Sequence, residues 1–304
     1  MENSYSILLF YNYVAIDNPD QLHLDQLSLC KRLNLKGRII VAHEGINATL
    51  EGKDSMIDEY LAEFLADPRF VDTDIKRDSG TGNAFPKLSV KIRSELVSLH
   101  LDNSDINPKT LTGKRVTPDE LHALYESGAE FTVVDMRNEY EYQSGHFRGA
   151  RLPALKHFRD LPNVISELED LKDKKIVTVC TGGVRCEKAS GYLLSQGFKD
   201  VSQLDGGIVS YMKRYPNQHF LGSLYVFDGR VSVSYDDGNH TVIGTCALCG
   251  AATETYANCS NLNCHDHFLV CDACPDHDGS VYCSTSCKAQ NTSVPLSLSN
   301  NNLF

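Results

Sequence analysis

The 304-residue chain contains no apolar run of the roughly 18 to 20 residues that a membrane-spanning helix needs. Its N-terminus also lacks a basic flank ahead of the short apolar stretch 7–10, which a secretory signal would carry. These absences favour a cytoplasmic protein with no membrane partner. In a reducing compartment, the 11 cysteines are expected to be free thiols, metal ligands or catalytic groups rather than disulfides.

An excess of positive charge is missing as well. Lys and Arg number 29 against 40 Asp and Glu, which gives a formal net charge of −11. This balance argues against a protein that coats nucleic acid with a broadly basic surface, so any such contact must be local. Three basic groups are candidates, although each is otherwise an ordinary solvated face: Lys87, Lys91 and Arg93; Lys109, Lys114 and Arg115; and Lys213 and Arg214.

Residues 1–102 alternate strand and helix patterns. Apolar and β-branched residues predict strands over 6–15, 38–50, 70–76 and 87–96, and helical spacing of leucines and other apolar residues predicts helices over 20–33 and 54–65. Apart from where the second helix falls, this order is close to βαββαβ, the ferredoxin-like α+β arrangement. A polar cluster, His43-Glu44-Gly45-Ile46-Asn47, interrupts the second strand. It indicates either a functional turn that exposes His43 and Asn47 or a structural kink at Gly45.

A second domain is expected over 117–222, after a linker over 103–116 that contains Pro108 and several small polar residues. It begins with a helix capped by Thr117, and three short buried strands follow over 131–135, 176–180 and 201–204. Helical patterns between these strands predict an α/β domain with a parallel sheet covered by helices. Ligands of such sheets lie beyond the carboxyl ends of the strands, where Asp135 and Cys180 fall.

The loop after the strand 176–180 carries the predicted chemistry. Cys180 precedes the start of a helix near Val184, so backbone N–H groups are expected to face its sulfur and to stabilise a thiolate or persulfide. Cys186 either resolves an oxidised Cys180 as a disulfide or simply packs in the core. Two glycines permit the tight turn and an arginine adds positive charge in the complete loop, Cys180-Thr181-Gly182-Gly183-Val184-Arg185.

Residues 223–292 hold eight of the 11 cysteines in four close pairs, and 293–304 are expected to be a loose tail. Eight thiolates match two tetrahedral zinc sites, with His265, His267 or His277 as substitutes for a thiolate. With all eight cysteines bound, no coordination position stays open, so about two structural zinc ions are predicted. The alternative is a cluster without a stable metal. The pairs are Cys246 and Cys249, Cys259 and Cys264, Cys271 and Cys274, and Cys283 and Cys287.

The central domain resembles a rhodanese domain. Asp135-Met136-Arg137, Glu141, the segment 145–150, the cysteine loop and the segment 205–208 occur in the order and spacing of that family. The resemblance implies that Asp135 and Arg137 support the site of Cys180. Tyrosine-phosphatase-like relatives have five residues between their cysteine and arginine. In this chain only four residues lie between Cys180 and Arg185, and this smaller loop suits a sulfur atom better than a phosphate.

From about residue 5 to residue 290 the chain resembles the rhodanese-related tRNA uridine hydroxylases (TrhO). The matching stretches are 43–47, Phe85-Pro86-Lys87 with Lys91 and Arg93, the loop 180–189, and the cysteine-rich end. The resemblance implies conversion of the wobble uridine (position 34) of tRNA to 5-hydroxyuridine. It also implies an essential Cys180 and molecular oxygen as co-substrate. Such a reaction needs an electron donor, which the sequence does not identify, and no organic cofactor is evident from the sequence. The candidates for tRNA binding are then Lys87, Lys91, Arg93, His43 and Asn47.

Two other functions compete with this one. The first is sulfur transfer through a persulfide on Cys180. The second is a zinc-dependent interaction module in which the rhodanese domain is only a docking surface, but the intact loop with both Cys180 and Arg185 weighs against it.

Overall fold

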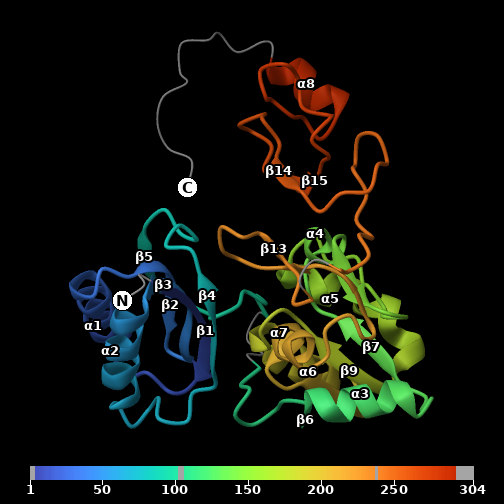
Figure 1. The fold of residues 1–304 in the computed structure, drawn as a ribbon. Coiled ribbons are helices and arrows are strands. Elements are labelled where there is room, and N and C mark those ends of the chain that lie inside the picture. Colours follow the sequence, from blue (N-terminus) through green and yellow to red (C-terminus); the bar gives the residue numbers. More distant parts are fainter. Residues whose placement is uncertain (1–3, 102–105, 237–238, 292–304) are drawn as a thin grey trace.

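The computed structural model describes residues 4–101, 106–236 and 239–291. The predicted tail 293–304 and residues 103–105 of the predicted linker lie outside the described residues. The N-terminal domain lies beside the central domain, and the C-terminal region extends away from both (Figure 1). Within the described residues, no helix combines the length and the apolar character needed to cross a membrane.

The N-terminal domain has the predicted ferredoxin-like arrangement, extended by one strand. Its sheet has the order β4-β1-β3-β2-β5, in which β5 runs parallel to β2 and the other neighbours are antiparallel. Both helices pack on one face, around Phe10, Tyr60 and Phe64. The elements are β1 (Tyr5–Tyr13), α1 (Pro19–Arg32), β2 (Lys36–Ala42), β3 (Gly45–Lys53), α2 (Asp54–Leu65), β4 (Ile75–Gly80) and β5 (Leu88–Ile92).

The prediction of one strand over 38–50 was wrong, because β2 and β3 form a hairpin that turns at His43 and Glu44. Gly45 has a φ of 144°, and a Cβ there would lie 1.9 Å from the carbonyl oxygen of Asn12. Only glycine allows the reversed chain to approach β1 so closely. The strand predicted over 70–76 was also misplaced: Phe70 stacks on Phe64 in a turn, and β4 begins at Ile75.

The central domain contains a parallel sheet of order β6-β10-β9-β7, as the alternating pattern predicted. Its edge strand, β6, lies at the end of the segment 103–116 that the sequence indicated as a linker. The capping box of Thr117 and Glu120 starts α3, where the sequence placed it. The elements are β6 (Lys114–Val116), α3 (Pro118–Glu126), β7 (Thr132–Asp135), α4 (Glu139–Tyr142), β8 (Gly145–Phe147), η1 (Phe158–Asp160), α5 (Leu161–Val164), η2 (Ile165–Leu171), β9 (Lys175–Val179), α6 (Val184–Ser195), β10 (Asp200–Leu204) and α7 (Gly207–Arg214).

The C-terminal region is built from short elements. β11 (Phe220–Gly222) pairs with β8 and so attaches the region to the central domain. The remaining elements are β12 (Leu224–Tyr225), β13 (Ser232–Val233), β14 (Tyr256–Asn258), β15 (His267–Leu269) and α8 (Thr285–Asn291). Its small core consists mainly of cysteines with Phe268, Val270 and Val281, so apolar burial alone offers little stability there.

Buried ion pairs join the first two domains. The ammonium group of Lys188 on α6 is fully buried and lies 2.9 Å from Glu44 and 3.1 Å from Glu95. Glu187, on the same helix, accepts hydrogen bonds from Tyr11 of β1 (3.0 Å) and from Arg115 (2.5 Å). Breaking a buried pair leaves uncompensated charge, which costs about 3 to 5 kcal/mol. These contacts therefore hold the sheet of the N-terminal domain against the loop that carries Cys180.

Candidate active site

Cys180 follows β9 directly, and its side chain is fully buried at the start of α6. The N–H of Gly183 donates a hydrogen bond to its Sγ at 3.2 Å. Gly183 has a φ of 102°, a conformation that suits glycine and aims this N–H back at the sulfur. The nest of N–H groups that the sequence predicted is therefore present.

The pKa of the Cys180 thiol is lowered to about 6. Burial is the largest single influence and acts in the opposite direction. It is outweighed by a hydrogen bond from the Cys186 thiol, the charge of Arg185, and the N–H groups of Cys186 and Arg185. The pKa of Cys186 is raised well above its ordinary value by burial and by the neighbouring Cys180. Cys180 is thus the thiolate of the pair, and Cys186 is its protonated donor.

This depressed pKa predicts how alkylation depends on pH. Because the thiolate predominates above the pKa, we expect iodoacetamide to modify Cys180 at half its maximal rate near pH 6, with a plateau above about pH 7.5. Peptide mass spectrometry of the intact protein measures this rate. Cys30, whose pKa burial raises to about 12, should remain unmodified over the same range. A midpoint near about pH 8.5, as for a free thiol, would contradict the assignment.

A chain of buried charges supports the loop. Arg185 is paired with Glu141 through two hydrogen bonds of 2.5 and 2.8 Å. Asp135 and Arg137 form a fully buried ion pair at 2.7 Å, and Arg137 also donates to the carbonyl groups of Glu141 and Gly145. Asp135 and Arg137 therefore lie behind the site, where they hold α4 and thereby Glu141.

The first turn of α7 packs against the loop and hydrogen-bonds to it. Ile208 and Val209 donate their N–H groups to the carbonyls of Cys180 and Thr181, at 3.0 and 3.1 Å. A Cβ on Gly207 would lie 2.6 to 2.7 Å from backbone atoms of Thr181, Gly182 and Gly183. Glycine at position 207 is therefore required by this close approach of two backbones.

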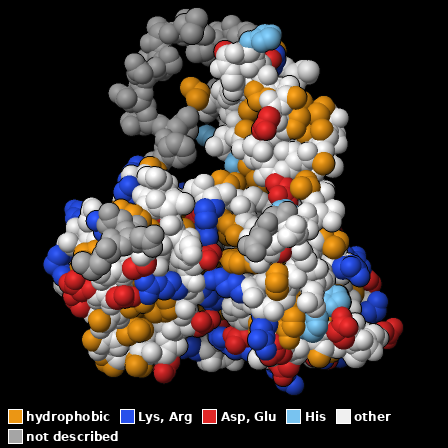
Figure 2. Space-filling view, in the orientation of Figure 1, with side chains coloured by type: hydrophobic (Ala, Val, Ile, Leu, Met, Phe, Trp, Pro, Cys, Tyr) orange, Lys and Arg blue, Asp and Glu red, His pale blue; other side chains and the backbone are white. Residues whose placement is uncertain are grey.

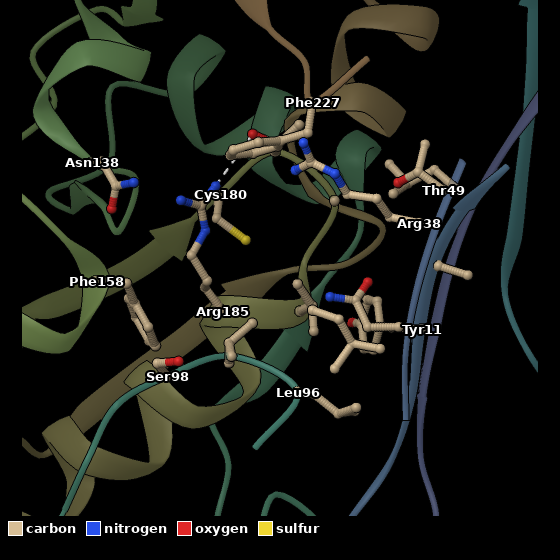
Figure 3. A pocket seen from close by; sticks show the side chains of 18 of the residues that line it. Tyr11, Arg38, Thr49, Leu96, Ser98, Asn138, Phe158, Cys180, Arg185 and Phe227 are labelled. Atoms are coloured by element: carbon tan, nitrogen blue, oxygen red, sulfur yellow. Dashed lines mark hydrogen bonds between the residues drawn. The ribbon is translucent and has the colours of Figure 1, made fainter. Parts of the chain in front are cut away.

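A cavity of about 500 Å³ opens between the domains, and Cys180 lies in its wall (Figure 3). The sheet of the N-terminal domain forms the opposite wall, with the face that its helices leave free. A Cβ on Gly182 would lie 3.0 Å from the side chain of Leu9, and a Cβ on Gly183 would lie 2.9 Å from the hydroxyl of Tyr11. The loop therefore packs closely against this wall. The lining residues are Leu9, Tyr11, Arg38, Ile40, Asn47, Ala48, Thr49, Leu96, Val97, Ser98, Asn138, His157, Phe158, Arg159, Cys180, Thr181, Gly182, Val184, Arg185 and Phe227.

The predicted nucleic-acid residues are separated by the structure. Asn47 lines the cavity, whereas His43 is exposed at the hairpin turn with its Nδ1 2.9 Å from the carbonyl oxygen of Ile16. Lys87, Lys91 and Arg93 are exposed along β5 and its flanks. Because Ile40 pairs with Lys91 across the sheet, these side chains project from the face that also lines the cavity.

Several residues that line the cavity could not be identified from a sequence motif. Phe158 and Phe227 come from segments without a motif, and Arg38 was counted only within a strand. The alternation of Leu9 and Tyr11 along β1 shows that they share a face, but not that another domain covers it. Their assignment needed the contact between two domains.

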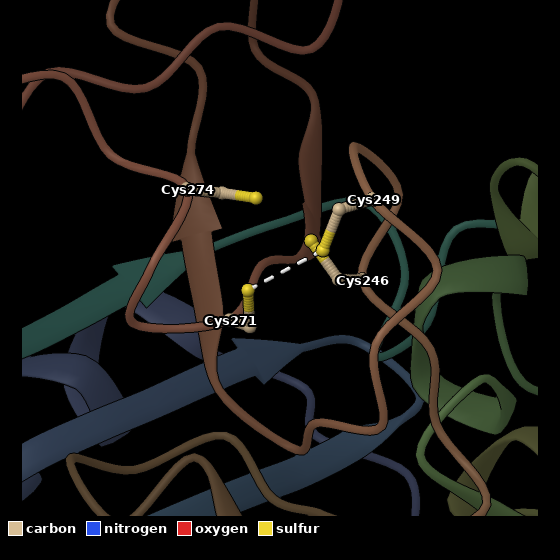
Figure 4. A group of neighbouring side chains, drawn as sticks. All are labelled: Cys246, Cys249, Cys271 and Cys274. Carbon is tan, nitrogen blue, oxygen red and sulfur yellow. Dashed lines mark hydrogen bonds between the residues drawn. The ribbon is translucent and has the colours of Figure 1, made fainter.

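The eight cysteines of the C-terminal region form two groups of four, and within each group the sulfur atoms lie within 4.8 Å of one another. Figure 4 shows the first group, in which Cys249 and Cys271 are 3.6 Å apart. A tetrahedral zinc with Zn–S bonds of about 2.3 Å requires S–S separations of about 3.8 Å, so the donor set fits a metal. No histidine belongs to either group. The groups are Cys246, Cys249, Cys271 and Cys274, and Cys259, Cys264, Cys283 and Cys287.

Family models match all three parts of the chain. An acylphosphatase-like N-terminal domain of the UPF0176 family matches residues 5–96, a rhodanese-like domain matches 117–214, and a rhodanese C-terminal model matches 221–288. The tRNA uridine(34) hydroxylase of Bacillus licheniformis is 46% identical over 291 residues, which cover 95% of this chain and 89% of the relative. The chain belongs to the tRNA uridine(34) hydroxylase family.

A second member of the family, from Staphylococcus carnosus, is 45% identical over 293 residues and covers 91% of this chain and 92% of its own. Among solved structures, a rhodanese-like domain from Anabaena is 26% identical. It covers 36% of this chain and 80% of its own, with a TM-score of 0.32. The two relatives and the rhodanese-like family model confirm the family and the rhodanese domain that the sequence predicted.

Proposed function

We propose that this enzyme converts uridine 34 of tRNA to 5-hydroxyuridine, with Cys180 as its catalytic residue. The observation that carries the proposal is the position of Cys180, a stabilised thiolate in the wall of a cavity of about 500 Å³, in a chain of this family. Such a volume suits a small ligand or a single flipped-out base. With tRNA as its substrate, the enzyme works in the cytoplasm.

The thiolate supplies the chemistry in this proposal. Sγ of Cys180 adds to C6 of the uracil ring, and the electron pair displaced toward C5 attacks molecular oxygen. One oxygen atom stays on C5 as a hydroxyl group, and the other leaves as water. This requires two electrons and two protons from an external donor. Loss of the C5 proton and of Sγ then restores the double bond and the free thiolate.

A comparison of tRNA nucleosides tests the function. Cells that lack the gene should lose 5-hydroxyuridine and its derivatives at position 34, as measured by mass spectrometry, and a wild-type copy should restore them. A Cys180→Ser copy should not. If deletion instead removed a thiolated nucleoside and left 5-hydroxyuridine unchanged, sulfur transfer through Cys180 would be the function.

We further propose that the exposed Lys87, Lys91 and Arg93 bind tRNA phosphates on the approach to the cavity. Figure 2 shows that Lys and Arg side chains gather locally between the N-terminal and central domains, although the chain is acidic overall. The face of the sheet that carries Lys91 continues into the cavity wall, where Asn47 can donate to and accept from a base. His43 lies farther out and would contact the backbone only.

Changing Lys87, Lys91 and Arg93 together to alanine should weaken tRNA binding and reduce its salt dependence. Each lost phosphate contact lowers the slope of log K against log salt by about 0.7 to 0.9, so the loss of three contacts lowers it by about 2.1 to 2.7. Binding titrations at several salt concentrations measure this slope. Lys31 and Lys174, exposed elsewhere, provide a control pair that should leave it unchanged. An unaltered slope in the triple variant would exclude this stripe from the tRNA site.

A further inference from the structure

Two arginines line the cavity from opposite domains. Arg38 projects from β2, and Arg159 belongs to η1 of the central domain. In Figure 3, Arg38 extends from the sheet toward Phe227 and the loop that carries Cys180. Both residues are exposed. The wall of the cavity that holds the thiolate therefore contains one arginine from each domain.

Neither guanidinium group has a hydrogen-bond or ion-pair partner among the described residues. Most other arginines of the described chain do form ion pairs, for example Arg32, Arg77 and Arg230. In a chain with 40 carboxylate side chains against 29 Lys and Arg, an acidic partner for a surface arginine is easy to supply. Because neither arginine has an acidic partner among the described residues, the N–H donors of both guanidinium groups are available to an external anion.

The register of the sheet indicates over which residues a bound polynucleotide would continue outside the cavity. Arg38 pairs with Ser89 and Ile40 with Lys91, so Arg38 lies on the same face as the stripe along β5. A polynucleotide that leaves the cavity past Arg38 continues along that stripe. Arg159 belongs to the other domain and lines the same cavity, so it is available to the part of the bound chain that does not pass Arg38.

We propose that Arg38 and Arg159 bind the two phosphates that flank the target nucleotide, one on each side of the cavity. A base that leaves its stack turns about these two phosphates, so holding both keeps the base in the cavity beside Cys180. The inference rests on the proposed function and adds the residues that position the nucleotide. Neither arginine takes part in the chemical step.

The test uses the full-length protein and a synthetic anticodon stem-loop RNA with uridine at the wobble position. Arg38→Ala and Arg159→Ala should each lower kcat/KM about tenfold or more, as expected for a lost charge-assisted hydrogen bond. Each should also reduce the salt slope by about 0.7. The matched control is Arg148→Ala, since Arg148 is exposed and lies outside the cavity. It should match the wild type.

RNAs in which one phosphate is replaced by an uncharged methylphosphonate identify the phosphate that each arginine contacts. A methylphosphonate on either side of the uridine should weaken binding to the wild type, and one of the two should have no further effect in Arg38→Ala. The other should have no further effect in Arg159→Ala. If the wild type hydroxylates the RNA while both variants behave like Arg148→Ala, the phosphate assignment is wrong. If the wild type itself leaves the uridine unchanged in the presence of oxygen and reductant, the proposed function fails instead.

Discussion

Replacing Cys180 with serine is expected to abolish formation of 5-hydroxyuridine, with kcat lowered by about 10⁴-fold or more. The N–H groups and Arg185 stabilise a thiolate, but a serine hydroxyl remains protonated at neutral pH and cannot add to the uracil ring. The measurement is single-turnover conversion of stem-loop RNA by the purified variant.

The fold should survive this substitution. Serine is slightly smaller than cysteine, and its oxygen can accept the hydrogen bond from Gly183. We expect the free energy of unfolding to change by less than about 1 kcal/mol, and RNA binding to stay near the wild-type value. Cys186→Ser should be milder, because its hydroxyl still donates toward Cys180. Full activity in Cys180→Ser would refute the central assignment.

Elemental analysis should find about two zinc ions per chain in protein purified without chelators. Cys271→Ser should lower this number to about one or fewer and destabilise the C-terminal region. The core of this region is small, and a structural zinc contributes on the order of 10 kcal/mol to folding. Thermal unfolding followed alongside the metal content measures both effects.

The order of the two cysteine groups along the chain adds a second expected effect, because it links the two metal sites. Along the chain, the ligand pairs of the two groups alternate, so Cys259 and Cys264 lie between the two halves of the first group. Loss of one metal should therefore loosen the other. Cys30→Ala is the control, because Cys30 lies in the core of the N-terminal domain and should leave two metal ions in place. A region that stays ordered without metal would refute the structural zinc.

Two features of the active site were predictable because they depend on a few consecutive residues. The strand at 176–180, the glycine pair and the start of α6 place backbone N–H groups around Cys180, and a parallel sheet places the loop at its carboxyl edge. The close cysteine pairs likewise indicated metal binding, since each pair forms a local turn. Which pairs share a metal site was not predictable, because all three ways of combining the four pairs satisfy the same spacing.

The rest of the site was decided by contacts between residues far apart in the sequence. Leu9 and Tyr11 contact the loop at 182–183, Glu44 pairs with Lys188, and Arg38 and Arg159 line one cavity from two domains. No local pattern encodes these contacts. Hydrophobic periodicity shows which face of an element is buried, but not which other element covers it. The sequence by itself determined the cysteine loop, the domain types and the four close cysteine pairs. Only the tertiary structure made a cavity from two domains, because the face of the N-terminal sheet that its own helices leave free must be covered by something else.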